Sequence, residues 1–210
     1  MLLFEEKVSQ NRTAFVARVK KLAKTFNINP NWLMALFNSE TGGTFRTDIY
    51  NMGGSGAVGL IQFMPKTAQD LGVSTSYLAS LSNIEQLDWV EKYLHRQLAN
   101  IGRSSINDYD DLYLLVFYPV AVGKPDSFVI PLSGIGYSQN SGIDMNRDGV
   151  ITVSDFKAFI RSKIPVDRLS EFTSRFRYGK QVFFVLVSLA LVSIVFYYFR
   201  LKSIKFSFFN

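Results

Sequence analysis

Apolar residues recur at three- and four-residue spacing through the first half of the chain, which is the pattern of helices with one buried face. One helix is predicted to end at Asn27, with basic residues on its outer face. A second begins at Pro30, which suits a first helical position, and ends at Gly42-Gly43, which suits a C-cap. The apolar faces consist of Phe15, Val16, Val19, Leu22 and Ala23 in the first helix, and Trp32, Leu33, Leu36 and Phe37 in the second.

Three further helices are predicted downstream. They run from Lys66 to Leu71, from Asn83, as a cap, to Asn100, and from Asp108 to Tyr118. Any sheet should be small and lie around residues 45–56. We therefore expect a mainly α fold.

The composition changes near the C-terminus. Residues 182–199 carry no charge, and as a helix they would span about 27 Å, close to the hydrocarbon thickness of a bilayer. A basic linker, 165–180, precedes them and a basic tail, 201–210, follows. This pattern predicts one C-terminal transmembrane helix at 181–200 that anchors the protein in a lipid membrane. A buried core helix is the alternative.

Charge and cysteine content narrow the choice of partners. The net charge of +6 favours an anionic partner, such as a cell-wall polymer, a membrane surface or a nucleic acid. Because the lysines near the N-terminus are expected to form a solvated helix face, we expect no nucleic-acid partner. The absence of cysteine excludes a disulfide scaffold. The first 26 residues lack the basic start of a secretion signal.

Glu40 is the candidate catalytic residue. It follows Leu36 by one turn, at the end of a mostly apolar predicted helix and next to a glycine-rich loop. Desolvation there should raise the pKa of the carboxyl group and keep it a proton donor near neutral pH. The alternative is a solvated carboxylate at a helix end.

Two motifs in this region resemble the catalytic core of soluble lytic transglycosylases, the SLT-domain family that is similar to goose-type lysozyme and cleaves peptidoglycan. The resemblance covers residues 20–130 and implies a lysozyme-like α+β domain over residues 1–135, with Glu40 as catalytic acid. The matching residues are Ser39-Glu40, Gly56-Ala57-Val58-Gly59-Leu60-Ile61-Gln62, Pro65 and Thr67-Ala68.

The resemblance also implies substrate-binding residues. Gln62 would hydrogen-bond the substrate, Gly56, Gly59 and Leu60 would form a wall of the sugar groove, and Tyr118 would bond near the catalytic carboxylate. The alternatives are an ordinary tight turn before a helix and a core tyrosine. Two family positions differ, because Pro119 replaces an asparagine after Tyr118 and Gly53 replaces a serine.

The implied activity is peptidoglycan lytic transglycosylation, which needs one carboxylate. Glu40 would protonate the leaving oxygen of the MurNAc-β-1,4-GlcNAc bond and then take the proton of the 6-hydroxyl, giving a 1,6-anhydro product. One alternative is a hydrolytic muramidase, a lysozyme with a second acid that activates water. The other is a catalytically inactive membrane-bound protein of wall-binding or structural type, which the changes at Gly53 and Pro119 would suit.

A second motif runs from Asp144 to Asp155. It matches the EF-hand calcium loop and resembles the dockerin type, with Gly149 at the sharp turn. The preceding YSQNSG segment is not expected to be helical, so residues 136–164 form an EF-hand-like segment rather than a full helix–loop–helix. One structural Ca²⁺ is predicted, with an Asp/Asn turn as the alternative. Its ligands would be side chains of Asp144, Asn146, Asp148, Thr152 and Asp155 and the carbonyl of Val150.

The predicted anchor conflicts with the predicted substrate. Peptidoglycan lies outside the cytoplasmic membrane, whereas residues 161–180 carry six Lys/Arg against three after residue 199, which favours a cytoplasmic catalytic domain. A bacteriophage with a membrane in its virion removes this conflict. We therefore expect a virion enzyme in the internal membrane, with virion proteins as partners. The host cell membrane is the alternative location.

Overall fold

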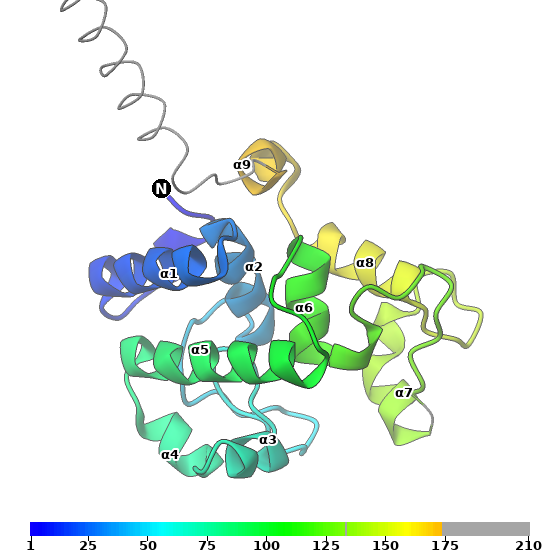
Figure 1. The fold of residues 1–210 in the computed structure, drawn as a ribbon, viewed down its shortest axis with the longest axis horizontal. Helices are drawn as coiled ribbons and strands as arrows, with labels where there is room; N and C mark the ends of the chain where they lie inside the picture. Colours follow the sequence, from blue (N-terminus) through cyan, green and yellow to red (C-terminus); the bar gives the residue numbers. More distant parts are fainter. Residues whose placement is uncertain (133, 174–210) are drawn as a thin grey trace, which may run out of the picture. The chain divides into compact units, whose positions relative to one another are not determined.

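Helix α2 (Pro30–Glu40) lies between α1 (Arg12–Phe26) and α6 (Tyr109–Phe117) and contacts both (Figure 1). Seven of its 11 residues are buried, including all five from Leu33 to Phe37. The Asn29 side chain caps it by accepting the N–H of Asn31 at 2.9 Å. The start at Pro30 and the burial of Leu33, Leu36 and Phe37 confirm the prediction from the sequence. The helix ends at Glu40, two residues before the predicted stop at Gly42-Gly43, and Trp32 is only partly buried.

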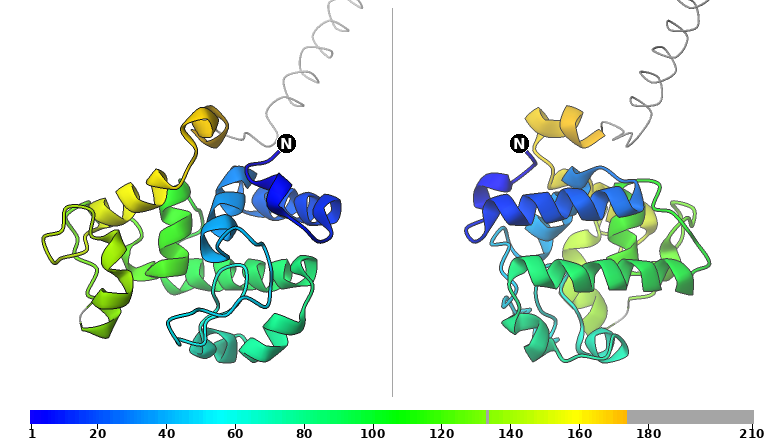
Figure 2. Two further views of the ribbon diagram at one scale, coloured as in Figure 1. Left: turned by 180° about the vertical axis from the view of Figure 1, so that it is seen from behind. Right: turned by 60° about the vertical axis from the view of Figure 1, so that its left-hand side comes forward.

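The structure is a computed structural model that describes residues 1–132 and 134–173. All of these residues belong to one compact unit, Met1–Phe176. Figure 1 and the reverse view in Figure 2 place α7 and α8 on the opposite side of α6 from α1. The other helices are α3 (Pro65–Asp70), α4 (Thr75–Ser80), α5 (Asn83–Asn100), α7 (Ile135–Asn140), α8 (Val153–Ser162) and α9 (Leu169–Thr173), with 3-10 turns at Glu5–Lys7, Pro119–Ala121, Ser141–Ile143 and Val166–Arg168.

The small sheet expected around residues 45–56 is reduced to single bridges. Tyr50 pairs with Val58 and Val58 pairs with Phe63, each as an isolated antiparallel bridge. The segment instead folds as turns, and two of its glycines, Gly54 and Gly56, have a positive φ. The fold is therefore mainly α, as predicted, with almost no extended strand in the described part of the chain.

Several local predictions need correction. Helix α5 is capped by Ser82 rather than by Asn83, because Ser82 and Glu85 form a capping box. Helix α7 forms where a non-helical segment is expected from the sequence. Its six residues show no periodic apolar face, and they lack the first-position proline that marks α3, which has the same length. Helix α9 lies within the predicted linker 165–180 and docks on α2, where the Trp32 indole donates to the Phe172 carbonyl at 2.9 Å.

The segment that is predicted to cross a membrane is not among the described residues. Across residues 1–132 and 134–173, no helix is long and apolar enough to cross a bilayer. The span predicted at 181–200 and the tail at 201–210 lie outside the described residues.

Candidate active site

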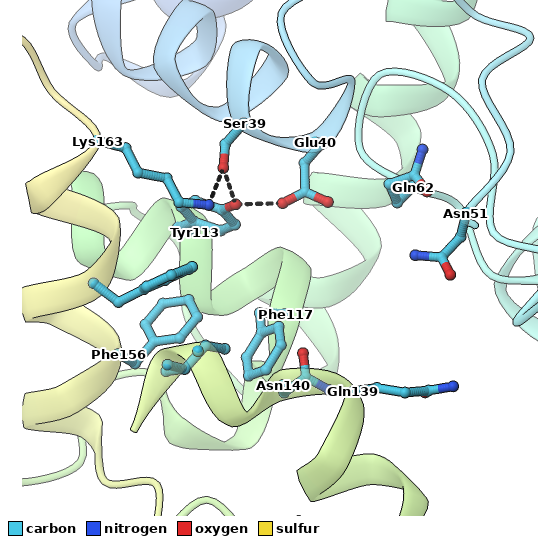
Figure 3. A pocket seen from close by; sticks show the side chains of 13 residues that line it. Ser39, Glu40, Asn51, Gln62, Tyr113, Phe117, Gln139, Asn140, Phe156 and Lys163 are labelled. Atoms are coloured by element: carbon cyan, nitrogen blue, oxygen red, sulfur yellow. Dashed lines mark hydrogen bonds between the residues drawn. The ribbon is translucent and has the colours of Figure 1, made fainter. Parts of the chain in front are cut away.

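Glu40 faces a groove formed by two cavities of about 300 Å³ and about 670 Å³. Both cavities are lined by Glu40, so they adjoin at its carboxylate. The groove lies between the end of α2, the loop before α3, the end of α6, and the α7–α8 region (Figure 3). The residues that line both cavities are Glu40, Asn51, Gln62, Phe117, Gln139 and Asn140.

The partner of Glu40 is Tyr113, from the middle of α6. The Tyr113 hydroxyl donates to Glu40 Oε1 and lies 2.8 Å from Ser39 Oγ. Lys163, the residue after α8, donates from its ammonium to the same Ser39 Oγ at 3.1 Å (Figure 3). Three segments far apart in the sequence therefore meet at one carboxylate.

Burial raises the pKa of Glu40, as predicted from the sequence. The hydrogen bond from Tyr113 and the charge of Lys163 act in the opposite direction but do not cancel the desolvation. Burial also holds the pKa of Tyr113 well above its usual value, so its hydroxyl stays a neutral donor. Glu40 is thus kept as a proton donor to a higher pH than an exposed glutamate.

Tyr118 does not have the position expected for it. It packs against the hydrophobic core and lines neither cavity, while Tyr113 supplies the hydroxyl next to Glu40. Five residues correspond to about 140° around a helix, so only one of the two tyrosines can face Glu40. A sequence pattern that contains both does not reveal which one does.

Gln62 lines the groove where it was predicted. Its backbone φ is 49°, and its side-chain nitrogen donates to the carbonyls of Ile49 and Gly59, each at 3.1 Å. These bonds fix the amide at the groove wall. Asn51, Gln139 and Asn140 add further amides, and no motif of the sequence pointed to them.

Gly59 and Leu60 have a structural role instead of the predicted groove contact. Leu60 is fully buried, and its N–H donates to Gln86 Oε1 at 2.7 Å. A Cβ on Gly59, whose φ is 79°, would lie 2.3 Å from the same Gln86 oxygen. Gly56 packs against the Pro65 ring, and none of these three residues lines either cavity. They shape the loop that presents Gln62.

The groove offers one acid. Among the described residues that line the two cavities, Glu40 is the only carboxylic acid. The single-acid expectation from the sequence therefore agrees with the composition of the groove walls.

The predicted calcium loop is a tight turn between α7 and α8. The buried Asp144 accepts N–H bonds from Asp148 at 3.3 Å and Gly149 at 2.9 Å, and the Tyr137 hydroxyl at 2.7 Å. Thr152 and Asp155 form the capping box of α8. Over the described ranges, no three His, Cys, Asp or Glu side chains are gathered closely enough to hold a metal ion.

The comparison with protein families gives one match. Residues 18–107 match the family model described as the Transglycosylase SLT domain. No match was found among curated proteins or among solved structures. The matched segment contains Glu40 and Gln62 but ends before Tyr113 and Lys163.

The structural role of Gly59 is testable. Gly59→Ala should destabilise the fold by about 2–4 kcal/mol, because left-handed strain and a clash with Gln86 add. Gly72→Ala is the matched control, since Gly72 has a φ of 85° with no atom within 4 Å of the place that an added methyl group would take, and should cost about 1–2 kcal/mol. Denaturant unfolding of both variants makes the comparison. Equal losses would contradict the close packing of Gly59 on Gln86.

Proposed function

We propose that this chain is a peptidoglycan lytic transglycosylase that cleaves its glycan at Glu40, on the premise that residues 18–107 match the transglycosylase SLT domain, whose members have this activity. Glu40 is the catalytic acid and base at the MurNAc-β-1,4-GlcNAc bond, and the product carries a 1,6-anhydro end. The observation that supports this most strongly is the single buried carboxyl group in the groove.

In the first step Glu40 acts as an acid. Its raised pKa leaves more of it protonated at a given pH than an exposed glutamate, and the protonated form can donate to the bridging oxygen while the C–O bond breaks and an oxocarbenium-like centre develops. The Tyr113 hydroxyl then stabilises the carboxylate that remains. Gln62, fixed to two carbonyls, is placed to hydrogen-bond the sugar.

In the second step Glu40 acts as a base. It takes the proton of the MurNAc 6-hydroxyl, whose oxygen attacks the anomeric carbon of the same sugar and closes the 1,6-anhydro ring. Glu40 thereby regains its proton, so the reaction requires no second carboxylic acid. An inverting muramidase would need a second carboxylate about 6.5–9.5 Å away to activate water. The described lining of the groove supplies none.

The products test this proposal. Mass spectrometry of peptidoglycan digested by the full chain in detergent should show 1,6-anhydro ends, one water lighter than hydrolysis products. Glu40→Gln should retain the fold and lose roughly 10²–10⁴-fold in rate, the usual contribution of general acid–base catalysis. Reducing ends from the wild type would indicate a muramidase. No cleavage by the wild type would favour an inactive wall-binding protein.

We also propose that the loop from Asp144 to Asp155 binds one structural Ca²⁺. Its donors are hard oxygens, which suit this ion. Further support is the curl of the loop, since Arg147 and Gly149 have φ values of 60° and 86°. The ion would brace the connection between α7 and α8, both of which contribute to the groove.

Metal removal tests the calcium proposal. An ion that binds only the folded state adds about 2.7 kcal/mol at a hundredfold excess over Kd, so EDTA should lower the melting temperature. Adding Ca²⁺ back should restore it. In the control Asp144→Asn/Asp148→Asn, EDTA should have no effect. The same melting curve of the wild type with and without EDTA would contradict the site.

The proposed location is a virion membrane. Support comes from the uncharged residues 182–199 and from the stronger positive charge before them than after them. That asymmetry keeps the enzyme on the cytoplasmic side of a host membrane, away from its substrate. An enzyme packed with a virion membrane reaches the wall of the next cell during entry, and a role in exit uses the same activity.

Particle fractionation tests the location. Purified virions should contain the protein, detergent should release it with the lipid fraction, and that fraction should clear peptidoglycan in a gel assay. Host envelopes, washed free of particles, are the control. Detection in host envelopes alone would contradict delivery by the virion and leave the enzymology unaffected.

A further inference from the structure

Lys163 brings a positive charge to the groove from outside the matched domain. Lys163 is an exposed residue that lines the smaller cavity, and its ammonium lies 4.1 Å from the centre of the Phe159 ring. Among the described residues, it is the only cation that acts on the charge of Glu40. The other titratable groups coupled to Glu40 are Tyr113 and Tyr109 of α6 and Tyr93 of α5.

A continuous chain of hydrogen bonds joins Lys163 to Glu40 (Figure 3). Lys163 Nζ lies 3.1 Å from Ser39 Oγ, and Ser39 Oγ lies 2.8 Å from the Tyr113 hydroxyl, which in turn contacts Glu40 Oε1. The Tyr113 hydroxyl carries one hydrogen but has two oxygen neighbours, Ser39 Oγ and Glu40 Oε1. Whether the Tyr113 hydrogen is donated to Glu40 or to Ser39 therefore depends on whether Ser39 Oγ is the donor or the acceptor in its contact with Tyr113.

The ammonium group settles that direction. A protonated lysine has three donors and no acceptor, so in this form Ser39 Oγ accepts from Lys163. Ser39 then donates its own hydrogen to the Tyr113 oxygen, and the Tyr113 hydrogen goes to Glu40 Oε1. Because Oε1 is always an acceptor in this arrangement, the proton of the neutral acid sits on Oε2. Figure 3 shows this second oxygen on the side of Gln62 and Asn51, away from Tyr113.

We propose that Lys163 is a positioning residue that orients the Ser39–Tyr113 chain and thereby keeps the transferable proton of Glu40 on the oxygen that faces the groove. This inference rests on the proposed role of Glu40 as acid and base. In the first step the proton leaves Oε2 for the bridging oxygen. In the second step the proton of the 6-hydroxyl returns to Oε2, and the chain through Oε1 does not change direction.

The packing of α8 holds Lys163 in place. Arg161 forms a two-pronged ion pair with Asp110 of α6. Phe156 stacks on Phe117 at 4.8 Å between ring centres and meets the Tyr113 ring edge-on at 5.4 Å. The helix that precedes Lys163 is thus fixed to the helix that carries Tyr113, so these two members of the chain keep their relative positions.

The charge of Lys163 affects the pH profile of the activity, which a purely structural role of this residue would leave unchanged. It lowers the pKa of Glu40 against the effect of burial, so its removal should raise that pKa further. Glu40 must be protonated to begin the reaction, and activity is lost as the pH rises through this pKa. The alkaline limb of the pH profile should therefore shift to higher pH when Lys163 is replaced.

The experiment compares pH profiles of kcat/KM on soluble glycan strands for the wild type, Lys163→Met and Lys163→Arg. We expect Lys163→Met to lose roughly tenfold or more at its optimum, because general acid catalysis is impaired, and its alkaline limb to move upward. Arginine also has donors only, so Lys163→Arg should restore most of both properties. Lys20→Met, at an exposed position of α1, controls for one lost charge and should leave the limb in place.

A second variant tests the chain itself. Ser39→Ala interrupts it but leaves the charge, so the rate should fall with a smaller shift of the limb. Because Lys163 positions Glu40 through Ser39, Ser39→Ala/Lys163→Met should be little slower than Ser39→Ala at its own optimum. Additive losses would overturn the shared chain. An unshifted limb in Lys163→Met, including a change in KM alone, would overturn the positioning role.

Failure of the proposed function gives a different result. If Glu40→Gln stays active, or if the products have reducing ends, the role of Glu40 itself is wrong. If Glu40→Gln is inactive, the products are 1,6-anhydro sugars and Lys163→Met behaves as the wild type, only the inference about Lys163 is wrong.

Discussion

The burial of the Glu40 carboxyl group at the end of α2 is the constraint on which the site depends. The preceding residues of this helix are buried in the core, so the carboxyl group is held at the boundary between the core and the groove. The C-terminal end of a helix carries a partial negative charge, which further disfavours an ionised carboxylate there. A group in this position resists ionisation, and the contacts around it determine how it gains and loses a proton.

Those contacts come from parts of the chain that the domain match does not include. The segment 18–107 supplies the acid, the glycine-rich loop and Gln62. Tyr113 comes from α6, and Lys163 follows α8, so the partners of the acid come from the C-terminal part of the described chain. The ion pair between Arg161 and Asp110 joins these two helices, which links the stability of the C-terminal wall to the geometry at Glu40.

The predictions that the structure confirms concern features that depend on neighbouring residues in the sequence. The helical spacing located α1, α2, α5 and α6, and the apolar environment of Glu40 predicted its raised pKa. The sequence did not predict contacts that depend on the relative rotation of distant helices, which is why Tyr118 was expected where Tyr113 lies. It also assigned glycines to the substrate wall, whereas the glycine at position 59 is required by a buried glutamine, Gln86, 27 positions further along the chain. The six residues of α7 show neither a periodic apolar face nor the first-position proline that marks α3.

Titration of Glu40 itself tests whether the fold keeps this carboxyl group protonated. Carbon-13 NMR of the protein labelled at its glutamate side-chain carboxyl groups gives one pH curve for each glutamate, and Glu40→Gln identifies the curve of Glu40. We expect this carboxyl group to titrate clearly above the range of an exposed glutamate, whose pKa is about 4.3. A Glu40 curve at or below that value would contradict the claim that the fold keeps this group as a proton donor.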